Sequence, residues 1–206
     1  NHQLMLLHGA QGKGKSTFIR HLLPPELKDY YRNGMIIPEN NNHLLQLSSC
    51  LLINLDEFDT LSPERMQNLK SLITQDVVNE RKVYDIQNYT YIRRASFIAS
   101  TNNPHCMPDV KENRRILFST LLNIDYHTPV NHEGIYAQAY ALYRQGFQYW
   151  YENEEITFLN NRNEAFRQKD PIEENLFFYF RAARQNDIQA QWYPASYLLS
   201  VLSMNG

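Results

Sequence analysis

The most constraining feature of the sequence is a glycine-rich segment, residues 9–16, that stands between an apolar run and a helix-prone run. It reads Gly-Ala-Gln-Gly-Lys-Gly-Lys-Ser and fits the pattern G-x-x-x-x-G-K-[ST]. Residues 3–8 predict a buried strand, and residues 15–23 predict a helix that ends at Pro24. A strand, a phosphate-binding turn and a helix in this order predict the α/β fold of P-loop proteins, and a chance glycine-rich turn is the alternative.

The chemistry of this loop predicts a nucleotide triphosphate as its ligand. Glycines let the backbone turn so that several N–H groups converge on phosphate oxygens. We expect Lys15 to reach the β- and γ-phosphates and the Ser16 hydroxyl to ligate Mg²⁺. The expected ATP-binding set is Gly9, Gln11, Gly12, Lys13, Gly14, Lys15, Ser16 and Thr17.

A second apolar run, residues 49–55, ends in two carboxylates and matches the Walker B pattern. We expect Asp56 to hold Mg²⁺, because a hard cation prefers oxygen ligands. Glu57 is the expected general base that polarises the attacking water. This second carboxylate favours a hydrolase over a small-molecule kinase, and a solvated acidic strand end is the alternative.

Two further polar positions flank predicted strands. Residues 95–100 predict a third buried strand, and Asn102 beyond it is the expected sensor that orients water, with ordinary turn chemistry as the alternative. Arg114 and Arg115 precede a fourth predicted strand at 116–124. A guanidinium there could stabilise the γ-phosphate on a neighbouring subunit, and a surface arginine pair is the alternative. The expected catalytic set is Lys15, Glu57, Asn102, Arg114 and Arg115.

Basic residues and tyrosines alternate between residues 81 and 94. Such a segment could form a hairpin whose cations contact nucleic-acid phosphates and whose rings stack on bases. A tyrosine-bearing surface hairpin without a ligand is the alternative. The candidate nucleic-acid contacts are Arg81, Lys82, Tyr84, Arg93 and Arg94.

Composition and patterning bound the rest of the chain. The 206 residues carry a formal net charge of −2, which excludes a globally basic nucleic-acid-binding protein. Two cysteines without metal-type spacing favour a reduced cytoplasmic protein, and we expect no zinc site at His105-Cys106 or His132-Glu133. No apolar run approaches the roughly 20 residues of a membrane helix, so no membrane partner is expected.

Strands alternating with helices predict a three-layer α/β/α core with a mostly parallel sheet. One of these helices is predicted to begin at Ser62-Pro63, with proline at its first position, and to carry on one stripe Met66, Leu69, Leu72 and Ile73. The expected domains are a P-loop ATPase core at 1–128 and a helical C-terminal lobe at 129–206. Both termini fall inside apolar patterns, so we expect the sequence to be a piece of a longer chain.

The motifs together resemble those of the virulence-associated E proteins, over residues 4–126. The similar segments are Gly-Ala-Gln-Gly-Lys-Gly-Lys-Ser-Thr, Leu-Asp-Glu-Phe, Leu-Lys-Ser-Leu-Ile-Thr, Arg-Lys-Val-Tyr, Ser-Thr-Asn-Asn and Glu-Asn-Arg-Arg. That family is related to superfamily-3 primase-helicases of phages and mobile elements. The resemblance implies an AAA+-like ring ATPase, hexameric on single- or double-stranded DNA, with an upstream primase-like domain. It also implies Lys15, Ser16, Asp56, Glu57 and Asn102 at the nucleotide, and an arginine from 114–115 supplied across the interface.

One departure from the family bears on the hairpin. Members often carry a proline and a glycine around the tyrosine equivalent to Tyr84, and Val83-Tyr84-Asp85 has neither. The leading hypothesis is an ATP-hydrolysing motor of a primase-helicase. The alternatives are a nucleotide-gated assembly or regulatory switch without helicase activity and, third, a small-molecule kinase.

Overall fold

The computed structural model describes residues 3–34, 36, 41–56, 58, 61–81, 87–107, 114–168, 171–184 and 186–204. The chain forms two compact units, Asn1–Arg167 and Gln168–Gly206. This division differs from the boundary expected at 128, because two helices beyond that position belong to the first unit.

The first unit begins with β1 (Leu4–His8), α1 (Lys15–Arg20), the 3-10 helix η1 (Pro25–Tyr30), β2 (Tyr31–Asn33) and α2 (Asn41–Ser49). It continues with β3 (Leu52–Leu55), α3 (Pro63–Thr74), β4 (Val77–Glu80), β5 (Tyr89–Ile92) and β6 (Ser96–Thr101). It closes with β7 (Ile116–Thr120), α4 (His132–Arg144) and α5 (Asn153–Glu164).

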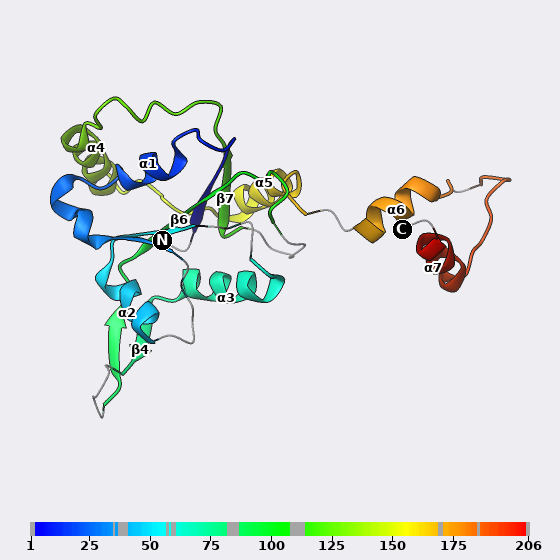
Figure 1. Cartoon of the computed structure of the whole chain (residues 1–206), viewed down its shortest axis with the longest axis horizontal. Coiled ribbons are helices and arrows are strands. Elements are labelled where there is room, and N and C mark those ends of the chain that lie inside the picture. Colours follow the sequence, from blue (N-terminus) through cyan, green and yellow to red (C-terminus); the bar gives the residue numbers. More distant parts are fainter. Residues whose placement is uncertain are drawn as a thin grey trace. The chain divides into compact units, whose positions relative to one another are not determined.

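The centre of the first unit is a five-stranded parallel sheet in the order β2-β3-β6-β1-β7. The strand β6 lies between β1 and β3, with Leu6 opposite Ala99 and Ile53 opposite Phe97. Figure 1 shows helices on both sides of this sheet, with α1 on one side and α3 on the other. The predicted α/β/α architecture with a parallel sheet is therefore confirmed.

Alternation along β1 divides the core into two apolar layers. Leu4 and Leu6 belong to the large cluster that also contains the buried face of α3. Leu7 points the other way and packs with Ile19 of α1 and Ile98 of β6. The predicted stripe of α3 is confirmed, since its members are buried: Met66, Leu69, Leu72 and Ile73.

The start of α3 also follows the sequence prediction. The Ser62 hydroxyl accepts the Arg65 N–H at 3.3 Å, and Pro63 stands at the first turn, where its missing N–H costs nothing. By contrast, α1 ends at Arg20 instead of Leu23.

The strands β4 and β5 form a separate antiparallel hairpin, in which Val78 lies opposite Tyr91. The base of this hairpin contacts α2, because the Leu47 carbonyl accepts the N–H groups of Arg94 and Ala95 at 2.9 and 3.0 Å. A hairpin was expected at residues 81–94, and the structure begins it earlier, at Val77.

The helix α5 and the residues after it complete the core next to β7. The Asn163 side-chain amide is fully buried and donates to the Ile116 carbonyl at 2.8 Å. The Phe166 ring stacks on Phe118 with centroids 3.5 Å apart. The apolar core therefore extends beyond the expected boundary at residue 128.

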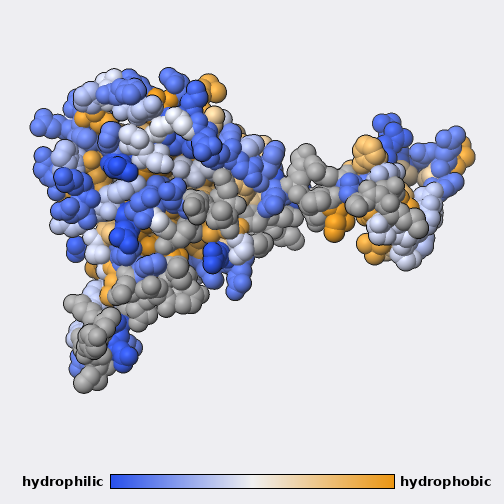
Figure 2. Space-filling view, viewed as in Figure 1, coloured by the Kyte–Doolittle hydropathy of each residue, from blue (hydrophilic) through white to orange (hydrophobic). Residues whose placement is uncertain are grey.

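The second unit contains α6 (Pro171–Tyr179) and α7 (Ala195–Met204). The Tyr193 ring connects the two helices, because it contacts both Phe180, which follows α6, and Tyr197 of α7. Figure 2 shows apolar residues on the surface of this unit, where Phe178 is 81% exposed. Among the described helices of both units, none has the length and apolar character needed to cross a bilayer.

Candidate functional site

The candidate site lies where the parallel strands of the sheet end. Because β1, β3, β6 and β7 run in the same direction, the segments that follow them meet at one edge. A pocket of about 650 Å³ opens there. Its lining is Gln11, Gly12, Lys13, Gly14, Lys15, Ser16, Thr17, Asp56, Ser100, Thr101, Asn102 and Tyr126. Most of the expected nucleotide-binding residues therefore border one cavity.

The glycine-rich loop has a backbone that only glycine adopts readily. Gly12 and Gly14 have φ angles of 78° and 79°, in the left-handed region. Gly14 also lacks room for a side chain, since a Cβ there would lie 2.0 Å from Cδ1 of Tyr126. Gly9, which does not line the pocket, anchors the start of the loop by donating its N–H to the Thr101 carbonyl at 3.2 Å.

Lys15 connects the loop to the end of β6. Its side chain is only 7% exposed. The ammonium donates to the carbonyls of Gly9 and Ala10 at 2.6 and 3.0 Å and to Oδ1 of Asn102 at 2.7 Å. Two residues of the expected catalytic set, 87 positions apart in sequence, are thus in direct contact.

The residue after Asn102, Asn103, makes the turn beyond β6. Oδ1 of Asn103 accepts the His105 N–H at 2.9 Å, and the Asn103 N–H donates to the Thr101 hydroxyl at 3.0 Å. These bonds fix the direction of the chain beyond β6 and leave the Asn102 side chain facing Lys15.

Two asparagine side chains, of Asn33 and Asn54, orient Asp56, and the sequence analysis did not predict this arrangement. Nδ2 of Asn33 donates to Oδ2 of Asp56 at 3.2 Å, and Nδ2 of fully buried Asn54 donates to Oδ1 of Asn33 at 2.6 Å. The signal that could have revealed it is Asn54 itself, a polar residue inside an otherwise apolar strand.

Tyr31 stands beside the same amides, with its hydroxyl 3.5 Å from Oδ1 of Asn33. Burial raises the pKa of Tyr31, and the Asp56 charge acts in the same direction, while Asn54 and Arg20 oppose it. The Tyr31 phenol therefore stays protonated at neutral pH and can serve as a donor next to Asp56.

Glu57, the expected general base, lies outside the described residues. Asp56 and Ser16, the expected Mg²⁺ ligands, border the same pocket. Carboxylate and hydroxyl oxygens are the donors that Mg²⁺ prefers, so these residues fit the ion.

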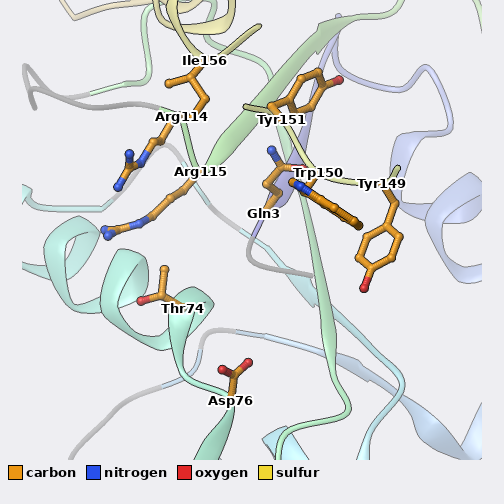
Figure 3. A pocket seen from close by; sticks show the side chains of 9 residues that line it. All are labelled: Gln3, Thr74, Asp76, Arg114, Arg115, Tyr149, Trp150, Tyr151 and Ile156. Atoms are coloured by element: carbon orange, nitrogen blue, oxygen red, sulfur yellow. The ribbon is translucent and has the colours of Figure 1, made fainter. Parts of the chain in front are cut away.

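Arg114 and Arg115 lie away from this pocket, because they precede β7 and stand at the opposite edge of the sheet. There they border a second cavity, of about 530 Å³. Figure 3 shows their side chains extending in the same direction, with three aromatic rings from residues 149–151 lining the same cavity. Within one chain the arginine pair does not join the lysine, aspartate and asparagine.

The candidate nucleic-acid residues of the hairpin divide into three groups. Arg81 and Arg94 are exposed. Arg93 is half-buried, donates to the carbonyls of Gln75 and Ala95 at 2.5 and 2.7 Å, and lies over the Phe97 ring. Burial lowers the pKa of this guanidinium. Lys82 and Tyr84 lie outside the described residues. Arg93 is therefore a group that holds the hairpin to the core.

The histidine of the pair His132-Glu133 makes a structural contact. Nε2 of His132 is 2.7 Å from the His21 carbonyl, which attaches α4 to the turn after α1. Among the residues that the structure describes, no three His, Cys, Asp or Glu side chains gather as a metal site would require.

A parallel five-stranded sheet whose first strand leads into a glycine-rich loop, with a lysine turned back into that loop, defines an α/β/α fold of the P-loop type. The family model of the virulence-associated protein E-like domain matches residues 2–168, so the chain belongs to that family.

Among solved structures, the chain is similar to apo structures of the NrS-1 C-terminal region. One has a TM-score of 0.45 and 17% identity and covers 80% of this chain. An A-form structure has a TM-score of 0.44 and 16% identity, and another has 0.41 and 18%. The chain spans 34–36% of the length of these structures. No curated protein matches the chain.

Proposed function

We propose that this chain binds ATP with Mg²⁺ and hydrolyses it as the motor domain of a primase-helicase of the phage or mobile-element type. The observation that carries the proposal is the contact between Lys15 and Asn102 in a pocket that also contains Asp56 and Ser16. A lysine, an amide, a carboxylate and a hydroxyl at the mouth of a glycine-rich loop are the groups that phosphoryl transfer to water requires.

The Lys15 ammonium has a role in coupling binding to chemistry. It donates to neutral oxygens of Gly9, Ala10 and Asn102. Bonds between an ammonium and an ionised phosphate are stronger than bonds to neutral oxygens. A triphosphate tail therefore draws Lys15 away from Asn102, and the released amide becomes available to orient water.

The carboxylate side of the pocket supplies the rest of the proposed site. Ser16 and Asp56 would hold Mg²⁺, which neutralises charge on the phosphates during transfer. The Asn33 amide orients the Asp56 carboxylate by donating to its Oδ2 at 3.2 Å. Glu57 would take the proton of the attacking water.

The proposal extends to assembly. Because Arg114 and Arg115 stand at the edge opposite the P-loop, a second copy must supply them if they act on ATP. A ring, six-membered on DNA, meets that requirement. In it the exposed Arg81 and Arg94 would contact single- or double-stranded DNA, and a primase-like domain would precede this part of the full-length chain.

A nucleotide-gated switch without helicase activity is the second candidate, and the position of Arg93 favours it. The Arg93 guanidinium is occupied by two backbone carbonyls, which removes one of the basic groups available to a DNA strand. Strong stimulation of hydrolysis by single-stranded DNA would support the motor, and slow turnover that ignores DNA would support the switch.

The test of nucleotide binding compares three proteins by titration calorimetry with Mg²⁺-ATP. We expect Lys15→Ala to lose measurable affinity, because it removes the buried ammonium that is expected to contact the β- and γ-phosphates. Lys28→Ala is the matched control, since Lys28 is an exposed lysine of η1 that does not border the pocket. Normal ATP affinity in Lys15→Ala would refute the binding site.

Hydrolysis is tested separately with Glu57→Gln. This variant should bind ATP normally and lose turnover by at least about a hundredfold, as expected when a general base is removed. Unchanged release of phosphate would exclude Glu57 from the mechanism.

A further inference from the structure

The segment that follows β7 runs directly over the glycine-rich loop. The Leu121 N–H donates to the His8 carbonyl at 2.8 Å, which continues the pairing of β7 with β1 up to the loop. Five residues later, the Tyr126 ring lies so close to Gly14 that an added Cβ would be 2.0, 2.5 and 2.7 Å from three ring carbons. Tyr126 thus contacts the loop at the residue immediately before Lys15.

This segment is held in a defined turn. The Asp125 carboxylate accepts the N–H groups of His127 and Thr128, both at 3.1 Å, and the Thr128 hydroxyl at 2.6 Å. These bonds to Thr128 and His127 lower the pKa of Asp125, so the turn is intact at neutral pH. The rings of Tyr126 and His127 are 4.2 Å apart. Two aromatic side chains are therefore presented together beside the loop.

Two hollows include Tyr126 in their lining. The pocket that contains Asp56 and Asn102 includes Tyr126 in its lining. A second hollow, of about 500 Å³, is lined by Gly12, Lys13 and residues 123–127. Because Gly12 and Lys13 border both, the two hollows adjoin across the glycine-rich loop.

The strand order gives the two hollows different roles. Asp56 and Asn102 follow β3 and β6, which lie on one side of β1, whereas Tyr126 follows β7 on the other side. A triphosphate whose terminal phosphate faces Asp56 and Asn102 has its nucleoside end toward β7. An aromatic ring at that end offers a flat apolar surface to a base.

We propose that Tyr126, on the turn at residues 123–127, is the nucleoside contact of this site and stacks on the base of the bound nucleoside triphosphate. This inference rests on the proposed function, and it assigns a binding role to a residue outside the Walker motifs. Asp125 acts through Tyr126 as a positioning residue.

The experiment measures affinity for two ligands, Mg²⁺-ATP and Mg²⁺-tripolyphosphate, which has the phosphates and no base. The variants are Tyr126→Ala, Tyr126→Leu and Tyr126→Phe. The control is Tyr143→Ala, a highly exposed tyrosine of α4 that borders neither hollow. Thermal melts check that each variant folds.

We expect Tyr126→Ala and Tyr126→Leu to weaken ATP binding by roughly tenfold, the effect of losing one base–aromatic stack. Tripolyphosphate affinity should stay within about twofold of wild type, because the phosphates do not contact the ring. Tyr126→Phe and Tyr143→Ala should match the wild type with both ligands. If Tyr126→Ala does not fold, the contrast between the Leu and Phe variants carries the same test.

Three results would overturn the assignment. Equal loss for both ligands means that the ring only shapes the loop. Tighter binding of both means that the ring obstructs the phosphate site, and unchanged binding of both means that it touches neither. These results are distinct from failure of the proposed function, in which the wild-type protein binds neither ligand.

Discussion

The bond between Lys15 and Asn102 joins the glycine-rich loop to the expected sensor at the end of β6. It holds the lysine close to where a β-phosphate would lie, and it keeps the asparagine amide turned toward the loop. Disturbing the two partners should therefore have different effects on binding and on turnover.

Two substitutions at Asn102 separate these effects. Asn102→Ala removes the sensor and keeps the lysine and its bonds to the Gly9 and Ala10 carbonyls. ATP affinity should therefore stay within about threefold while kcat falls by about a hundredfold, the usual effect of losing one transition-state donor. Asn102→Asp puts a carboxylate beside the ammonium, and ATP must then displace an ion pair. Its affinity for ATP should fall as well. Calorimetry and steady-state phosphate release measure the two quantities.

Asn103→Ala is the control for the Asn102 pair, because Asn103 makes the neighbouring turn and its side chain does not reach Lys15. Equal losses of kcat in Asn102→Ala and Asn103→Ala would mean that the chain direction after β6 matters and the Asn102 amide does not.

At the scale of helices and strands, the structure follows the sequence where the apolar pattern is strong. The strand β6 and the helix α3 were predicted because each buries a continuous run or a full stripe. The helix α2 was missed, since its asparagine-rich start is typical of a loop and its main apolar anchor is Leu47. The strand β2 has three residues, too few for a periodicity to appear.

The candidate site was predictable as far as local motifs extend. Lys15, Ser16 and Asp56 stand at fixed places in strand–loop patterns, so their meeting follows from parallel strands. Asn33 and Tyr126 were not predictable, because no local pattern tells which edge strand or which later loop folds against the site. Arg93 was assigned to a ligand by its charge, and only tertiary structure reveals the carbonyls it binds.

In the hairpin β4–β5, the residue that attaches the hairpin to the core can be tested separately from the residues proposed to bind DNA. Arg93→Ala should lower the free energy of unfolding by about 2 kcal/mol, because it removes charged hydrogen bonds to two carbonyls. Arg94→Ala should leave stability within about 0.5 kcal/mol, since that side chain is exposed. Urea denaturation of the two variants measures the difference.

Binding of single-stranded DNA completes the hairpin test. Loss of DNA affinity in the double variant Arg81→Ala/Arg94→Ala would identify the two exposed arginines as the DNA contact. The remaining DNA affinity of this variant should also depend less on salt than that of the wild type. Wild-type DNA affinity in that double variant would refute a nucleic-acid role for the exposed arginines. Arg93→Ala cannot serve for this purpose, because it changes the support of the hairpin.

At the scale of the whole molecule, the first compact unit and the family model cover nearly the same residues. The first compact unit ends at Arg167, and the family model ends at residue 168. The agreement has a physical cause, since residues up to Arg167 contact the sheet or its loops. Met107 forms a bridge with Arg167, and Phe166 covers Phe118.

These contacts predict how the chain responds to shortening. A chain that ends at residue 168 should unfold cooperatively and bind ATP like the full chain, because it keeps every contact of the first unit. A chain that ends at residue 128 exposes the Phe118 ring and leaves the Ile116 carbonyl without the Asn163 amide. Losing a stacked phenylalanine costs about 3 kcal/mol, a large part of the roughly 5–15 kcal/mol that stabilises a domain. Thermal melts with and without ATP compare the two chains, and an equally stable, ATP-binding chain of 128 residues would show that α5 is dispensable to the core.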